Sequence, residues 1–230
     1  MQYKTIHTFP VEEEKKESIQ IDLRKQLVTT PYFHSPKIVC GIDLAYKENL
    51  AAAVIVAMDH STHEIVELVY HVEEVMESYV PGMLAFRELP LILKAWEKLT
   101  IEPDVVFFDG NGMLHPRRMG IASHASFFLQ KPTIGIAKTY LLGDHKPLGL
   151  KQGEYEFMED QGEVIGAIVR TQTGVKPVYV SIGNYLALED AIRLSMEQVG
   201  KISRLPEIVR QADIYSRKIL REYMQSPKTI

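Results

Sequence analysis

Hydrophobic and polar residues recur with two different periods along this chain. Residues 11–27 place apolar side chains at near-helical spacing between charged ones, which predicts a helix. Three strand-like apolar runs follow, separated by short polar breaks, at 37–46, 50–58 and 64–72. Because breaks this short suit hairpin connections, we expect the three strands to pair antiparallel as a meander.

The second part of the chain alternates helix-like and strand-like segments. A helical pattern over 83–99 contains Pro90, which a first turn tolerates but which would kink a helix interior. Further helices are expected over 117–130, 187–199 and 206–223. Strands are expected over 105–109, 133–137 and 177–181, with a glycine-marked hairpin region over 153–170. With no internal repeat, low-complexity tract or linker, the pattern predicts one α/β domain spanning residues 1–230.

Composition excludes several classes of protein. A hydrophobic content of 46% with 24% charged residues is typical of a globular chain with a core. No apolar run approaches the ~20 residues of a membrane helix, and the first residues lack a signal-peptide pattern. The one cysteine, Cys40, cannot form an internal disulfide. We therefore expect a cytoplasmic protein without a membrane partner, in which Cys40 is a small buried hydrophobe.

Charge is distributed unevenly. The net charge is -4, yet residues 201–230 hold seven Lys or Arg against three acids. A basic segment of this kind can face a phosphate backbone in a protein that is acidic as a whole. A solvated helix face explains the same pattern equally well, so charge leaves both interpretations open.

Three acids fall at the ends or starts of predicted elements. Asp43 ends an apolar run on the first strand, Asp109 ends the fourth strand, and Glu88 lies early in the helix between them. A meander followed by alternating helix and strand would set the first and fourth strands side by side, with the helix crossing nearby. Carboxylates brought together would repel, and bound Mg²⁺ or Mn²⁺ removes that cost. Two such ions ~4 Å apart can hydrolyse a phosphodiester, so the combination indicates a metal-dependent hydrolase.

Each acid alone has a simpler explanation. An aspartate at a strand end, followed by glycine as in Asp109-Gly110, is often a turn residue, and surface helices are rich in glutamate. The metal interpretation therefore rests on the three acids together.

Five segments taken together resemble the endonuclease V family, whose members recognise deaminated bases. They are "GIDLAY" (41–46), "YVPGMLAFRELP" (79–90), "DGNGMLHPRRMGIASH" (109–124), "KPTIGIAKTYL" (131–141) and "RLPEIVRQAD" (204–213). The resemblance covers nearly the whole chain. It implies a ribonuclease H-like fold, with a central mixed sheet of an antiparallel meander plus parallel strands, flanked by helices.

The resemblance also implies roles for single residues. Asp43, Glu88 and Asp109 match the metal-binding carboxylates, and Asp213 is a fourth ligand or a close neighbour of the metal. His115 and Lys138 match polar residues around the scissile phosphate, which completes the catalytic set. The expected DNA-binding residues are Tyr79, as a wedge beside the lesion, Pro81, Gly82, Gly110, Gly112, Arg117 and Arg118.

The activity implied is hydrolysis of DNA 3′ to deoxyinosine, one nucleotide beyond the lesion, by a monomer that uses Mg²⁺ or Mn²⁺. This endodeoxyribonuclease leaves 5′-phosphate ends and begins repair. An inosine-specific ribonuclease and a non-cleaving nucleic-acid-binding module on the same fold are the alternatives. The chain departs from the family pattern at Ser78, where a proline is usual, and at Ile182 and Asn184, where Pro-Gly-His is common.

Overall fold

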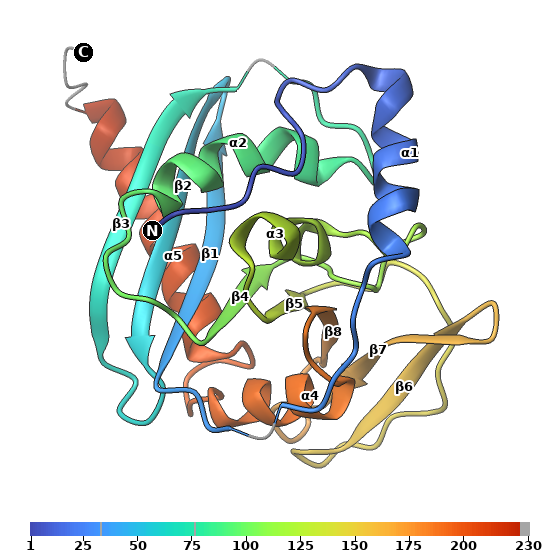
Figure 1. The fold of residues 1–230 in the computed structure, drawn as a ribbon. Helices are drawn as coiled ribbons and strands as arrows, with labels where there is room; N and C mark the ends of the chain where they lie inside the picture. The colour runs from blue at the N-terminus through green and yellow to red at the C-terminus, as the bar shows by residue number, and fades with distance from the viewer. Residues whose placement is uncertain (33, 76, 226–230) are drawn as a thin grey trace.

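A computed structural model describes residues 1–32, 34–75 and 77–225 of the chain (Figure 1). Its elements, in order, are α1 (Glu13–Arg24), β1 (Ile38–Lys47), β2 (Leu50–Asp59), β3 (Ile65–Glu74), α2 (Leu84–Trp96), β4 (Val105–Asp109), α3 (Ile121–Leu129), β5 (Thr133–Ala137), β6 (Tyr155–Asp160), β7 (Glu163–Val169), β8 (Val178–Asn184), α4 (Leu188–Glu197) and α5 (Glu207–Gln225).

All eight of these strands form one mixed sheet in the order β3-β2-β1-β4-β5-β8-β7-β6. The first three strands form the predicted antiparallel meander, and β4 and β5 lie parallel to β1. The hairpin of β6 and β7 extends the sheet through β8, which pairs antiparallel with β5. The predicted α/β fold with a mixed central sheet is confirmed.

Helices cover both faces of this sheet, which Figure 1 shows with α2 and α3 in front and α5 behind. Side chains alternate between the faces along each strand. On β1, Cys40 and Ile42 pack in the cluster that contains α2 and α3, whereas Val39 packs in the cluster that contains α4 and α5. The predicted core positions Cys40 and Trp96 are fully buried.

Two sequence predictions about local structure are corrected. The helix expected from Arg117 begins only at Ile121, because Arg118 takes a positive φ of 58° and Gly120 is extended. Asp43 does not end its strand, since β1 continues to Lys47 and stays paired with β2. Pro90 lies inside α2, beyond its first turn.

The close approach of α5 to the sheet depends on Gly41. A Cβ atom at this position would lie 2.4 Å from the backbone oxygen of Ile208 in α5. Only a residue without a side chain allows the helix to lie this near β1, and this contact sets how closely the rest of α5 approaches the strand ends.

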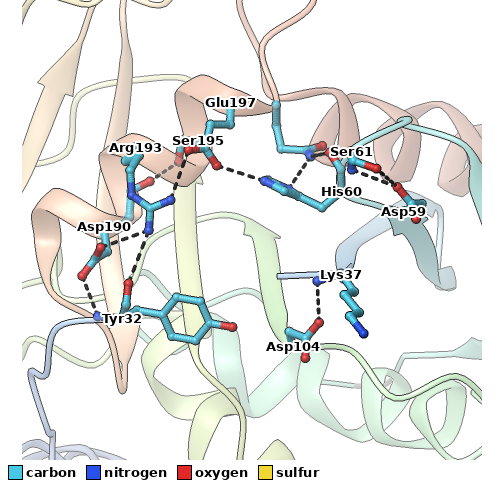
Figure 2. A network of polar contacts seen from close by, with 12 residues as sticks. Tyr32, Lys37, Asp59, His60, Ser61, Asp104, Asp190, Arg193, Ser195 and Glu197 are labelled. Atoms are coloured by element: carbon cyan, nitrogen blue, oxygen red, sulfur yellow. Dashed lines mark hydrogen bonds and ion pairs between the residues drawn. The ribbon is translucent and has the colours of Figure 1, made fainter. Parts of the chain in front are cut away.

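Polar contacts hold the start of β1, at the end of the strand away from Lys47 (Figure 2). The Asp104 carboxylate accepts the backbone N–H groups of Lys37 and Ile38 at 2.8 and 3.0 Å. Nearby, Glu197 of α4 contacts His60, at the end of β2, and Arg193. These contacts connect α4 to the meander.

His124 lies in an aromatic cluster under the N-terminal segment. Its Nε2 atom lies 2.8 Å from Nε2 of His7, and its ring meets Phe86 and Phe128 edge-on or tilted. Nδ1 of His124 is buried and has no hydrogen-bond partner within the described part of the chain. Burial, with a smaller effect of His7, lowers the pKa of His124 to about 3.

Across residues 1–32, 34–75 and 77–225, no helix combines the length and apolar character that a membrane crossing requires.

Substituting Gly41→Ala tests the contact between β1 and α5. The new methyl group would collide with backbone atoms, and overpacking of this kind costs about 1–3 kcal/mol. We expect a lower free energy of unfolding in urea denaturation. Gly200→Ala is the control, because its nearest added contact would be 3.8 Å away. Equal effects of the two substitutions would refute the close-approach argument.

His124 should make the fold sensitive to acid. An unfolded histidine takes up a proton near pH 6.5, whereas the folded state resists protonation of His124 until about pH 3. Its contribution is therefore complete above about pH 6.5 and is lost as the pH falls toward 3. We expect His124→Phe to flatten the fall of the melting temperature between pH 7 and pH 4. An unchanged slope would contradict this assignment.

Candidate active site

Two aspartates meet because β1 and β4 are parallel and in register. Ile42 pairs with Phe108, so the next residues, Asp43 and Asp109, are neighbours across the two strands. Both side chains point to the face covered by α5, which contributes Asp213. Carboxylate oxygens of these three residues lie within 4.8 Å of one another. Three elements distant in sequence thus converge on one acidic cluster.

Cations and a hydroxyl group offset part of this negative charge. The Lys138 ammonium, just after β5, contacts Asp109 and lies 3.0 Å from Asp213. Arg217, one turn further along α5, lies 2.6 Å from the Asp213 carboxylate. Among the described residues, the Asp43 side chain accepts one hydrogen bond, from the hydroxyl of Ser216. Burial and the neighbouring charge of Asp109 raise the pKa of Asp43 to about 7.

Glu88 reaches the same cavity from the other face of the sheet. The Tyr46 hydroxyl donates to Oε1 of Glu88 at 2.9 Å. Burial, with smaller contributions from the charges of Asp43 and Asp109 and against the Tyr46 hydrogen bond, raises the pKa of Glu88 to about 8. Glu88 and the three aspartates line a cavity of about 260 Å³. Glu88 comes from α2, which covers the opposite face of the sheet from α5. It therefore lies outside the tight cluster of Asp43, Asp109 and Asp213.

The donor chemistry of this cavity fits a divalent metal ion. Four carboxylates line it, against the two cations Lys138 and Arg217. Burial, and then the charges of Asp109 and Asp213, raise the pKa of Asp43, as expected for carboxylates held together without enough positive charge. Hard oxygen donors around a small cavity are the ligands that Mg²⁺ and Mn²⁺ prefer.

A second cavity of about 390 Å³ adjoins the first and shares Leu84 and Ile121 with it. The Tyr79 side chain, on a loop before α2, is 61% exposed at this cavity. The structure gathers most of the predicted DNA-binding residues here: Tyr79, Pro81, Gly82, Gly110 and Arg117.

The other two predicted DNA-binding residues have partners inside the protein. A Cβ at Gly112 would lie 2.1 Å from the Ile182 carbonyl oxygen, so this glycine allows the loop to pack on β8. Arg118 is 2% exposed, and its guanidinium forms ion pairs with Asp160 and Glu163 at 2.8 and 2.7 Å. The sequence predicts that Arg118 binds DNA. In this structure its side chain instead holds the β6–β7 turn and is not exposed to a phosphate.

The carbonyl oxygen of Gly82 is a hub that fixes the Tyr79 loop. It accepts hydrogen bonds from His115 at 3.1 Å, Gln20 at 3.0 Å and Arg117 at 2.9 Å. Nδ1 of His115 accepts the backbone N–H of Arg117, which leaves Nε2 as the donor to Gly82. Burial, and then the charge of Arg117, lowers the pKa of His115 to about 4, so the ring is neutral at pH 7.

His115 was expected beside the scissile phosphate. It lines the second cavity rather than the acidic one. Gln20, on α1, was not anticipated, because a glutamine among charged residues gives no signal of burial in sequence, yet it is 0% exposed. Asn184, at a departure from the family pattern, is also buried, and its side chain accepts the backbone N–H of Val28 at 2.8 Å.

Comparisons with known proteins agree with this geometry. The sequence profile described as Endonuclease V matches residues 21–214. Endonuclease V from Petrotoga mobilis is 44% identical over 219 residues, covering 95% of this chain and 99% of the relative. The crystal structure of the Bacillus subtilis protein has a TM-score of 0.93 at 40% identity, covering 99% of this chain and 100% of that one. Ciona intestinalis Endonuclease V, in complex with a 24mer DNA containing an inosine followed by a ribo-adenosine, has a TM-score of 0.79 at 25% identity, covering 91% and 98%.

Asp43→Asn should stabilise the metal-free protein, since it removes a carboxylate whose charged form is disfavoured by burial and by Asp109. A gain of ~1 kcal/mol would raise the melting temperature by about 2–4 °C. The same substitution should shrink the rise that saturating Mn²⁺ causes in the wild type, because it removes a ligand. Differential scanning fluorimetry, with and without metal, measures both effects.

Asp22→Asn, in α1 and away from the cavity, is the control and should keep the full metal-induced shift. A full shift in Asp43→Asn would contradict a metal role for Asp43.

Proposed function

The chain belongs to the endonuclease V family and is an endonuclease that acts on DNA; from that premise, we propose that it hydrolyses the phosphodiester one nucleotide 3′ of a deoxyinosine. The observation that carries the proposal is the adjacency of two cavities. One is acidic, and the other has an exposed tyrosine at its mouth and shares Leu84 and Ile121 with the first.

Substrate recognition is proposed to take place in the second cavity. Enzymes that act at a damaged base often turn it out of the stack, at a cost of a few kcal/mol. The cavity of about 390 Å³ falls within the size range of small-ligand sites. Tyr79 would fill the gap left in the stack. The DNA complex of the Ciona intestinalis relative, which contains inosine, supports this choice of lesion.

Hydrolysis is proposed to take place at the acidic cavity with Mg²⁺, for which Mn²⁺ substitutes. Asp43, Asp109, Asp213 and Glu88 would hold the metal. Bound divalent ions supply Lewis acidity to the phosphate and lower the pKa of an attacking water. Lys138, which contacts Asp109 and Asp213, can turn its ammonium toward a phosphate oxygen. His115 acts through Gly82, by holding the loop that carries Tyr79.

We also propose that residues 1–230 act as one domain and as a monomer in the cytoplasm. The single sheet that runs from β3 to β6 supports one folding unit. The buried and free Cys40 is compatible with a reducing compartment.

The decisive assay compares matched DNA and RNA oligonucleotides, with and without one inosine, in Mg²⁺. We expect a single product cut one nucleotide 3′ of the inosine, with a 5′-phosphate on the downstream fragment. Asp109→Ala should abolish the product while binding of inosine DNA survives, because the substitution removes a metal ligand and leaves the Tyr79 cavity unchanged. Cleavage that persists in excess chelator would overturn the metal mechanism, and preferential cutting of RNA would overturn the DNA assignment.

Tyr79 should contribute to recognition more than to hydrolysis. A base–aromatic stacking contact is worth about 1–3 kcal/mol, so Tyr79→Ala should weaken binding of inosine DNA by about 10- to 100-fold. Tyr79→Phe keeps the ring and should retain most of the affinity. Binding of inosine and unmodified duplexes, measured by fluorescence anisotropy, checks this expectation.

Tyr155→Ala is the matched control, because Tyr155 is an exposed tyrosine on the edge strand β6. If Tyr79→Ala kept the wild-type preference for inosine, Tyr79 would only stabilise its own loop and would have no role in recognising the lesion.

A further inference from the structure

A third cavity continues from the acidic one along α5. It measures about 450 Å³ and lies between the end of β1 and the C-terminal half of α5. Its apolar floor includes the buried Ala45 and Leu220, and its walls carry Lys47, Arg217 and Arg221. Arg217 lines both this basic groove and the acidic cavity, so the two lie next to each other.

The charged residues that line this basic groove are all positive. None of the described residues that line it is acidic. Within residues 1–32, 34–75 and 77–225, neither Lys47 nor Arg221 forms an ion pair, and both are exposed. A fourth cation, Arg87, lies over the ring of Tyr46 in the wall, 4.5 Å from its centroid. In a chain with a net charge of -4, a groove that gathers these cations and in which only Arg217 is paired, with Asp213, is a favourable site for an anion.

The remaining cations of the C-terminal region show that this arrangement is not a general property of α5. Arg210, near the start of the helix, is paired with Glu207 at 2.7 Å. Lys218, which lines a different surface, has Glu222 one turn away at 3.9 Å. Among the α5 cations within the described residues, Arg221 alone lacks a carboxylate partner, and it lines the basic groove. One face of α5 therefore fits a solvated helix surface with paired cations, and the face at the groove fits contact with a phosphate backbone.

The three cavities follow one another in a fixed order. The Tyr79 cavity joins the acidic cavity at Leu84 and Ile121, and the acidic cavity joins the basic groove at Arg217. We propose that the basic groove binds the sugar–phosphate backbone on the 3′ side of the scissile bond. This inference rests on the proposed function, with the lesion base in the first cavity and the bond to be cut at the carboxylates.

The direction of the strand follows from that order. Hydrolysis occurs on the 3′ side of the lesion, so a strand that enters at the Tyr79 cavity and passes the carboxylates continues 3′ toward Lys47 and Arg221. The groove holds the downstream fragment, whose new 5′-phosphate forms beside Arg217. Lys47 and Arg221 neutralise backbone phosphates irrespective of base, and the apolar floor accommodates the sugars.

The test uses Lys47→Gln, Arg221→Gln and the double variant with two inosine-containing single strands of equal 5′ flank. One extends about fifteen nucleotides 3′ of the inosine, and the other ends about two nucleotides beyond it. On the long strand we expect the double variant to raise KM by about tenfold with kcat within about twofold of wild type. The slope of log KM against log salt concentration should fall by roughly 0.7 for each cation removed. On the short strand, variant and wild type should have the same KM.

Lys37→Gln is the matched control. It removes an exposed lysine at the other end of β1, where the backbone N–H rather than the ammonium contacts Asp104 (Figure 2). It should leave KM unchanged on both strands. An equal rise in KM on the long and short strands, or no rise on either, would overturn the groove assignment. The proposed function would still hold in that case, provided that the wild type cleaves inosine DNA. Failure of the wild type to cut either strand would instead refute the proposed function.

Discussion

Mutual repulsion among Asp43, Asp109 and Asp213 is the constraint on which the rest of this structure depends. Their oxygens lie within 4.8 Å of one another in a partly open cavity of about 260 Å³. Each is held by a different element: a strand paired on both sides, the end of a parallel strand, and a helix that Gly41 admits close to β1. Because packing of the sheet against α5 fixes the backbones, the charges cannot move apart. Cations must offset the charge instead, and Lys138 and Arg217 do so only in part.

The acidic cluster and the cavity beside Tyr79 are built from different elements. The face under α5 supplies the acidic cluster, whereas α1, α2 and the loop before α3 fix Tyr79 through the carbonyl oxygen of Gly82. The two cavities share Leu84 and Ile121 in their walls, so they lie next to each other. This division is consistent with the place of His115, which contacts the Tyr79 loop through Gly82 and not the carboxylates.

The sequence predicted the elements that local pattern controls and missed those that depend on packing. Strand alternation and short breaks were enough for the meander and for β1 beside β4, and hence for Asp43 next to Asp109. Periodicity could not tell that Glu88 and Asp213 approach from opposite faces, since that depends on which side each helix crosses. Nor could it tell that Arg118 is buried with Asp160 and Glu163, or that Gln20 is buried, because a polar side chain reveals its partners only after folding.

A divalent-metal site built from Asp43, Asp109 and Asp213 can be observed by anomalous diffraction from crystals soaked in Mn²⁺, because the signal locates the ion independently of activity. We expect a peak at bonding distance from carboxylate oxygens of Asp43 and Asp109, with the Lys138 ammonium displaced from between Asp109 and Asp213. A peak elsewhere in the molecule, or none at this cluster at saturating Mn²⁺, would contradict it.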